Sequence, residues 1–228
     1  MKTIGLIGGM SWESTRAYYE IINQTVKERL GGLHSAKLLL YSMDFAELEP
    51  YQTRSEWDRA SAMLTDAAQR LETAGADFLV LCSNTAHKIA PEISAAVSIP
   101  LLHIADAAVQ AVQAAGVESV GLLGTRYTMT ESFYTSVLER AGLRVLIPEE
   151  AEIDAIHRVI FDELCLGVVR EPSAQLLQTV IERLCARGAQ GIVLGCTELN
   201  MLLKPEDAAV PMFDTTLLHA RQAALQSI

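Results

Sequence analysis

Short apolar runs alternate with longer amphipathic segments along most of this chain of 228 residues. The segment at 55–75 carries apolar residues at helical spacing and ends at Gly75, a residue type that commonly terminates helices. The apolar runs have the length of strands buried inside a protein. Strands alternating with helices predict parallel sheets flanked by helices. We expect strands at residues 2–9, 36–45, 77–82, 99–104, 117–124, 143–148 and 191–196, and helices at 11–32, 55–75, 90–98 and 105–116.

The chain also contains an internal repeat, because three stretches of the first half recur in the same order in the second half. The pairs are IGLIGGMSWEST at 4–15 with VGLLGTRYTMTES at 120–132, GADFLVLCSNT at 75–85 with GAQGIVLGCTE at 188–198, and IPLLH at 99–103 with VPMFD at 210–214. The middle pair aligns without gaps. Strand ends in any α/β chain look somewhat alike, but this similarity does not account for the near-equal spacing of the pairs.

The repeat predicts an α/β fold made of two pseudo-symmetric three-layer domains with parallel sheets. We expect the first domain at 1–98 plus the C-terminal segment 209–228, and the second at 99–208. No stretch rich in Pro, Gly and Ser separates them, so we expect the two domains to pack tightly.

The gap-free pair places Ser83 on Cys196, and each of these residues follows an apolar strand and precedes a polar turn. Ligands of open α/β sheets bind beyond the carboxyl ends of the strands. We therefore expect both side chains to face a shared cleft from opposite sides. Two small proton-carrying groups across a substrate suit inversion at carbon, because one removes a proton and the other delivers one to the opposite face.

Four motifs, CSNTAHK at 82–88, LGCTEL at 194–199, GLIGGM at 5–10 and the GT turn at 124–125, resemble those of the aspartate/glutamate racemase family. The resemblance covers essentially the whole chain. It implies catalysis without pyridoxal phosphate by two cysteines. The chain looks closest to the enterobacterial L-aspartate/glutamate-specific racemases, which share GGMSWEST, GGLHSA, HIADA, GTRYTM and ELCLG and carry Thr before NT.

The resemblance also implies roles for individual positions. Ser83 and Cys196 fall on the two catalytic sites, Asn84 and Thr85 on the residues that hold the α-carboxylate, and Met10, Gln52, Thr125, Thr197 and Glu198 in substrate-contacting loops and turns. Glu198 is expected either to contact the substrate amine, to position Cys196 or to act as a surface cap. The family typically has a lysine where this chain has Cys165, so the holder of the side-chain carboxylate stays open. Arg54 and Arg126 are candidates for it, or are solvated arginines.

A thiolate is the useful base for this chemistry, and a free cysteine has a pKa of about 8.5. A helix N-terminus would lower the pKa of Cys196 if residues 197–203 are helical. Backbone N–H groups and short polar side chains at Asn84, Thr85 and Thr197 can bind a carboxylate and stabilise the enolate-like state. We expect no cofactor, because GLIGGMS at 5–11 matches neither G-x-G-x-x-G nor a Walker A loop.

Ser83 is a poor carbanion-forming base, because a hydroxyl is far harder to deprotonate than a thiol. Our hypothesis is that Cys196 takes the proton from one enantiomer, the L form by family analogy, and that protonation comes from the Ser83 side. Two alternatives remain, an engineered serine in place of another natural residue and catalysis by Cys82. Strand alternation should turn Cys82 towards the core. His87, just after this turn, is either an orienting group or a structural hydrogen-bonder.

Composition narrows the class of protein. The net charge is −10 without any Lys/Arg block, so nucleic acid is an unexpected partner. The apolar run at the N-terminus is too short for a signal peptide or a membrane span, and we expect a soluble cytoplasmic protein. Four cysteines without metal-ligand spacing make structural zinc and disulfides unexpected, with Cys185 as an ordinary buried thiol.

The sequence as a whole predicts a cofactor-independent racemase of aspartate and/or glutamate, whose partner is a small dicarboxylic amino acid. The family resemblance implies a homodimer. One alternative is a decarboxylase or isomerase of a small dicarboxylate, since such a reaction needs only one good thiol. The other is a non-catalytic binder of acidic metabolites.

Overall fold

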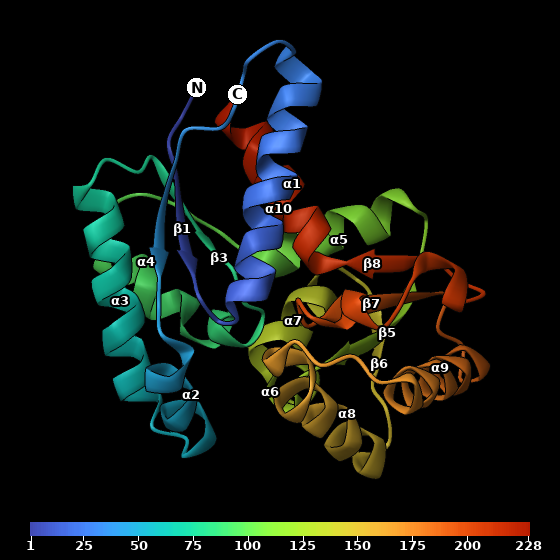
Figure 1. Cartoon of the computed structure of the whole chain (residues 1–228). Coiled ribbons are helices and arrows are strands. Elements are labelled where there is room, and N and C mark those ends of the chain that lie inside the picture. The colour runs from blue at the N-terminus through green and yellow to red at the C-terminus, as the bar shows by residue number, and fades with distance from the viewer. The chain divides into compact units, whose positions relative to one another are not determined.

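The computed structural model describes residues 1–205 and 207–228 in full and residue 206 by its backbone alone. Its strands form two four-stranded parallel sheets, with the orders β2-β1-β3-β4 and β6-β5-β7-β8 (Figure 1). The strands are β1 (Ile4–Gly8), β2 (Leu38–Ser42), β3 (Phe78–Leu81), β4 (Leu101–Leu102), β5 (Ser119–Gly124), β6 (Arg144–Leu146), β7 (Gly191–Gly195) and β8 (Met212–Asp214). The matching orders confirm two α/β halves of related build.

Contacts divide the chain into one unit of residues 1–104 with 219–228 and a second unit of residues 105–218. These boundaries differ from those expected at 98/99 and 208/209. The short strand β4 pairs with β3 and completes the first sheet, and β8 likewise completes the second sheet by pairing with β7. Each chain crossover therefore comes after the last strand of a sheet. The predicted cleft between the two halves stays a prediction.

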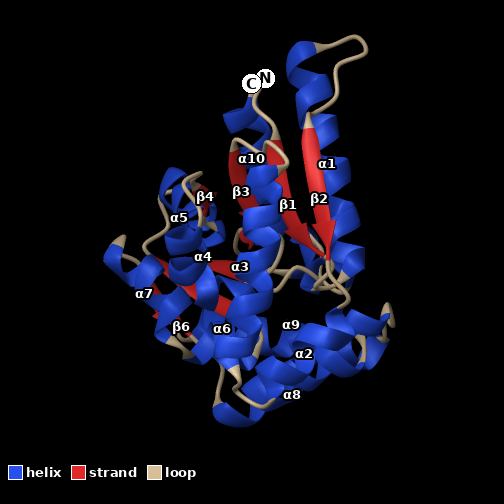
Figure 2. Ribbon diagram, turned by 90° about the vertical axis from the view of Figure 1, so that its left-hand side faces the viewer, coloured by secondary structure: helices blue, strands red, loops and turns tan.

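The first sheet has helices on both faces, because consecutive side chains of a strand point to opposite sides. One face packs against α1 (Trp12–Leu30) and α10 (Thr215–Ser227), and Cys82 joins this cluster after Phe78 and Val80. The other face packs against α3 (Trp57–Thr73) and α4 (Ala90–Ala96). Figure 2 shows β2, β1 and β3 side by side in this sheet. The predicted core-facing direction of Cys82 is confirmed.

Glycines at matching repeat positions let a helix approach each sheet closely. A Cβ on Gly5 would lie 2.9 Å from the Cβ of Ala76, just after α3. A Cβ on Gly121 would lie 3.0 Å from Leu184 on α9 (Glu171–Ala186) and 2.8 Å from Ile192. Interiors as dense as those of proteins cannot absorb such contacts without strain. The repeated glycines thus serve helix packing in both halves.

Two local predictions were incomplete or wrong. Helix α2 (Phe45–Thr53) was not expected, and Pro50 lies within it. Asp44 caps this helix by accepting a hydrogen bond from the Ala46 N–H at 3.0 Å. The expected helix at 197–203 is only the short 3-10 turn η3 (Leu199–Met201). Pro205 follows closely and disfavours helical backbone in the residue before it, which keeps this turn short.

The remaining helices connect these strands. They are η1 (Thr85–Ile89), α5 (Ile104–Ala114), α6 (Arg126–Thr130), α7 (Ser132–Arg140), α8 (Glu150–Asp162), η2 (Leu164–Leu166) and η4 (Pro205–Asp207). Helices α6, α8 and α9 contact β5 of the second sheet. Among the described residues, no helix is both long and apolar enough to cross a membrane.

Candidate active site

The first candidate turn follows β3. The N–H of Cys82 still donates to the carbonyl of Ile7 at 2.9 Å, and the chain then leaves the sheet at Ser83. Ser83, Asn84 and Thr85 are all buried. The Ser83 Oγ accepts a hydrogen bond from the backbone N–H of Ala86 at 3.3 Å. The serine oxygen is therefore engaged as an acceptor, and its own proton is left to donate.

The glycine-rich turn after β1 lies at the same edge of the first sheet, because β1 and β3 pair in parallel. Gly9 has a φ of +90°, and a Cβ there would lie 2.2 Å from the carbonyl oxygen of Met43, so only glycine fits. The Gly9 N–H donates to Thr15 Oγ1 at 2.8 Å. These contacts hold the Met10 backbone beside the Ser83 turn.

Two predicted substrate-contacting residues of this unit are buried. Met10 is 5% exposed and belongs to the same core cluster as Leu48 of α2. Gln52, also on α2, is 2% exposed. Their burial shows that both side chains help to pack this edge of the sheet, and their contact with a substrate stays a prediction.

The second candidate turn follows β7 and contains Cys196, Thr197 and Glu198, all buried. The Cys196 thiol donates to Glu198 Oε2 at 3.1 Å, and the Thr197 hydroxyl donates to the same oxygen at 2.7 Å. The Glu198 side chain therefore turns back onto the two residues before it. The surface-cap interpretation of Glu198 is wrong, because only 4% of the residue is exposed.

The pKa of the Cys196 thiol is raised well above its ordinary value, first by burial and then by the nearby charges of Glu198 and Cys165. The expected lowering by a helix N-terminus is thus wrong. The turn η3 is too short to provide a strong dipole, and a carboxylate lies against the sulfur. The effect of Cys165 shows that this half-buried residue lies near Cys196.

The second unit also brings Thr125 to the Cys196 turn. Gly124 of β5 is paired with Gly195 of β7, and Thr125 and Cys196 are the next residues of the two strands. A Cβ on Gly124 would lie 2.6 Å from the carbonyl oxygen of Gly195, so the two strand ends are in close contact. Thr125 Oγ1 accepts from the N–H of Thr128 at 3.3 Å and caps α6.

Cys82, Cys185 and the candidate Arg126 lie in other environments. Cys82 lies in the apolar core cluster that packs against α1 and α10, and burial there raises the pKa of its thiol. Cys185 is half-buried on α9, so the expectation of an ordinary buried thiol was wrong there. Arg126 binds the carboxylates of Glu150, at 2.8 Å, and Asp154, so the positive charge of its guanidinium is already balanced by two negative charges.

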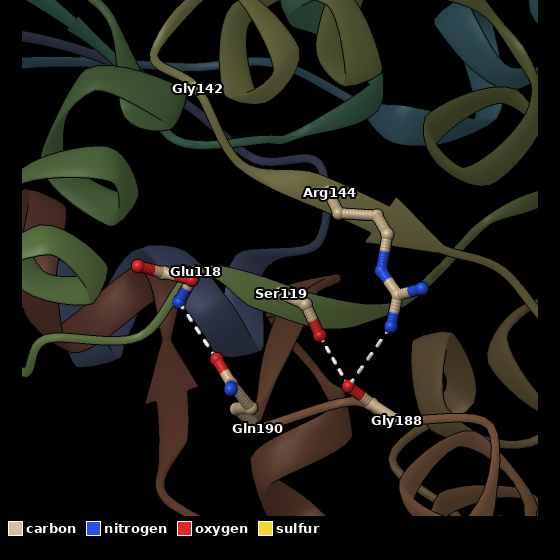
Figure 3. Close-up of a pocket in the computed structure, with 6 residues that line it drawn as sticks. All are labelled: Glu118, Ser119, Gly142, Arg144, Gly188 and Gln190. Carbon is tan, nitrogen blue, oxygen red and sulfur yellow. Dashed lines mark hydrogen bonds between the residues drawn. The ribbon is translucent and has the colours of Figure 1, made fainter.

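A hollow of about 450 Å³ lies where the strands of the second sheet begin, at the other end from Cys196. Figure 3 shows that its polar groups bind one another. The Gly188 carbonyl accepts from the Ser119 hydroxyl and, at 3.3 Å, from Arg144, while Gln190 Oε1 accepts from the Glu118 N–H at 2.9 Å. These groups bind one another where the strands begin, and we assign them no catalytic role.

Among the described side chains, no cluster of His, Cys, Asp and Glu is arranged to hold a metal ion.

Residues 7–223 match the family described as Asp/Glu/Hydantoin racemase. The chain belongs to this family. Membership confirms the resemblance drawn from the motifs, and it makes the protein an enzyme of the amino-acid racemase class. Ser83 and Cys196, at matching strand ends, therefore lie in a racemase fold.

Solved structures and a curated relative agree with this racemase assignment. A Yersinia pestis protein proposed to be an Asp/Glu racemase is 50% identical, with a TM-score of 0.92 and coverage of 100% of this chain and 99% of that chain. An aspartate racemase homologue of Pyrococcus horikoshii OT3 is 33% identical, with a TM-score of 0.85 and the same coverage. The broad specificity amino-acid racemase RacX of Bacillus subtilis (strain 168) is 26% identical over 96% of this chain and 95% of its own length. The narrower resemblance to L-aspartate/glutamate-specific racemases stays a prediction.

Proposed function

We propose that this enzyme racemises aspartate and/or glutamate without a cofactor, using Cys196 to remove the α-proton and the Ser83 side to return one. The observation that carries the proposal is the Cys196 thiol hydrogen-bonded at 3.1 Å to the buried carboxylate of Glu198, in a chain of the racemase family. The proposal requires that one substrate molecule reach both side chains, on opposite faces of its α-carbon.

Glu198 gives the Cys196 proton a place to go. The thiol and the carboxylate share one hydrogen bond, and transfer of the proton along it leaves a thiolate beside a neutral acid. The raised pKa makes this thiolate a strong base, which suits the weakly acidic α-proton of an amino acid. The ammonium group of a bound substrate would favour the charged thiolate form.

Ser83 is suited to donate a proton and poorly suited to remove one. Its oxygen already accepts the Ala86 N–H, and this hydrogen bond stabilises negative charge on that oxygen when its proton leaves. Among the described residues, no basic side chain is hydrogen-bonded to its hydroxyl, whereas the Cys196 thiol is hydrogen-bonded to the carboxylate of Glu198. The two sites are therefore chemically unequal.

The turns supply uncharged donors for the α-carboxylate. Asn84 and Thr85 follow Ser83, Thr197 follows Cys196, and Thr125 lies at the neighbouring strand end. Such donors bind an anion without adding net positive charge to an acidic protein, and they stabilise charge that develops at the α-carbon. We assign Met10 and Gln52 to the walls of the substrate site.

The unequal sites cannot alter the equilibrium, since both directions cross the same transition states. The equilibrium constant between enantiomers is close to unity, so kcat/KM must be nearly equal for the two. Kinetic asymmetry should appear instead in kcat and KM separately, as different intermediates accumulate. Strong asymmetry in kcat/KM would contradict the proposal.

The test is incubation with each enantiomer of aspartate and glutamate in D2O, following deuterium at the α-carbon and chirality together. We expect deuterium incorporation with inversion, abolished in Cys196→Ala and largely retained in the matched control Cys82→Ala. Release of CO2 would instead establish a decarboxylase, and thermal stabilisation by the ligand without exchange would establish a binder.

A further inference from the structure

Three histidines that are far apart in the sequence meet behind the Ser83 turn. The rings of His87 and His103 lie 4.5 Å apart between centroids, and those of His87 and His219 lie 5.8 Å apart. Tyr18 of α1 extends the cluster through a 2.9 Å hydrogen bond between its hydroxyl and Nδ1 of His219. All four residues belong to the first unit.

The hydrogen bonds of His87 define its protonation state. Its Nε2 accepts from the backbone N–H of Ile104 at 3.1 Å, so this nitrogen carries no proton. Its Nδ1 lies 2.7 Å from the carbonyl oxygen of Ser83 and must donate to it. His87 is thus neutral, in agreement with a pKa lowered first by burial and then by His103 and His219.

These contacts connect the Ser83 turn to both chain crossovers. Ile104, held by His87, is the last residue of the first unit before the chain leaves it. His219 is the first residue after the chain returns, and its Nε2 donates to the carbonyl of Leu102 at 2.9 Å. The histidine cluster therefore fixes the Ser83 carbonyl relative to the points where the chain enters and leaves this unit.

We propose that His87 is a positioning residue for Ser83. The inference rests on the proposed function and adds a residue to it. The peptide carbonyl of Ser83 cannot rotate while His87 holds it, and its orientation also sets the directions of the Ser83 side chain and the Asn84 N–H. His87 therefore serves proton delivery at Ser83, and proton removal at Cys196, which follows β7 in the other unit, does not depend on it.

Two substitutions separate the two hydrogen bonds of His87. In His87→Asn, the amide NH2 stands near the former Nδ1 and can still donate to the Ser83 carbonyl, while the acceptor for Ile104 is lost. In His87→Gln, the amide oxygen can still accept from the Ile104 N–H near the former Nε2, while the donor to Ser83 is lost. The pair is matched in polarity and burial, and differs in which partner it keeps.

The experiment compares two reactions of each variant, using the amino acid that the wild-type enzyme inverts. Inversion of the L enantiomer needs both sites. Elimination from its 3-chloro derivative needs only the base at Cys196, because loss of the α-proton expels chloride and leaves an enamine that tautomerises and is hydrolysed by water to a 2-oxo acid and ammonia. Chloride release thus reports the Cys196 side alone, and it also reports whether a variant is folded.

We expect His87→Gln to lower kcat for inversion by about tenfold or more with little change in KM, and to leave chloride release within about twofold. His87→Asn should restore most of the inversion rate. Equal losses of both reactions in His87→Gln, or equal inversion rates in the two variants, would overturn the role of His87. A wild-type enzyme that performs neither reaction would instead overturn the proposed function.

Discussion

The Cys196 thiol donates a hydrogen bond of 3.1 Å to the carboxylate of Glu198, and both side chains are buried at the end of β7. The carboxylate raises the pKa of the thiol, yet it is also a nearby acceptor for the thiol proton. By raising the pKa, the carboxylate should slow alkylation of the thiol, and by accepting the proton it should speed inversion. The two rates can be measured separately.

Glu198→Gln should uncouple thiol reactivity from catalysis. Removing the negative charge lowers the pKa of Cys196, so alkylation of this residue by iodoacetamide at pH 8 should become faster. Inversion should become slower by about tenfold to a hundredfold, because the proton acceptor is gone. Peptide mass spectrometry measures the alkylation of Cys196, and polarimetry measures inversion.

Cys165→Ser is the matched control for Glu198→Gln. It also removes a group that raises the pKa of Cys196, but it leaves the proton acceptor in place. Alkylation of Cys196 should therefore rise while inversion is retained. Unchanged inversion in Glu198→Gln would contradict the assigned role of the carboxylate.

Substitutions of Ser83 should alter one half of the reaction. Ser83→Ala has no proton to deliver, so inversion should fall by about a hundredfold or more, whereas elimination of chloride from the 3-chloro substrate should continue. Ser83→Cys supplies a thiol, which is far easier to deprotonate than a hydroxyl, and it should raise kcat with the D enantiomer. Chiral chromatography of the products measures both effects. Normal inversion by Ser83→Ala would exclude Ser83 as the second site.

Acid should destabilise the first unit through its histidine cluster. Burial lowers the pKa of His219 to about 3, against about 6.5 in an unfolded chain, and its neighbours are Tyr18, His87 and His103. The unfolded chain therefore binds more protons at low pH. The stability from the neutral form is fully present above about pH 6.5 and is lost progressively as pH falls towards 3.

The expected loss from His219 alone is about 2 kcal/mol in the free energy of unfolding between pH 7 and pH 5. Urea denaturation followed by circular dichroism at a series of pH values measures it. His219→Gln should flatten this dependence, whereas His34→Gln, at an exposed histidine, should leave it unchanged. A wild-type stability that is constant over this range would contradict the assignment.

The homodimer implied by the family resemblance remains a prediction, and α1 offers a place to test it. Trp12 and Tyr19 of this helix are 62% and 53% exposed. The two side chains are seven residues apart and so lie on one face of the helix, and a contiguous exposed apolar patch often marks a protein contact. Sedimentation velocity should show about twice the chain mass of 24.8 kDa, and Tyr19→Glu should shift the population towards monomer. Leu40→Glu, at an exposed position on the edge strand β2, provides a second site for comparison.

Local patterns in the sequence predicted most of the architecture. Short apolar runs located the strands and helical spacing located the helices, because these patterns reflect local backbone geometry. The repeat then placed Ser83 and Cys196 at equivalent strand ends. Helix α2 was missed because Pro50 lies within it, and the unit boundaries differed because a strand as short as Leu101–Leu102 does not reveal its pairing partner.

The sequence by itself thus determined the α/β class, the positions of most strands along the chain and the two turns that carry the candidate chemistry. Only the tertiary structure decided the environment of those turns. It turned Glu198 onto Cys196, raised the thiol pKa by burial, and brought His87, His103 and His219 together behind Ser83. Burial, and contacts between residues as far apart in the sequence as His87 and His219, depend on the folded chain, and no local pattern encodes them.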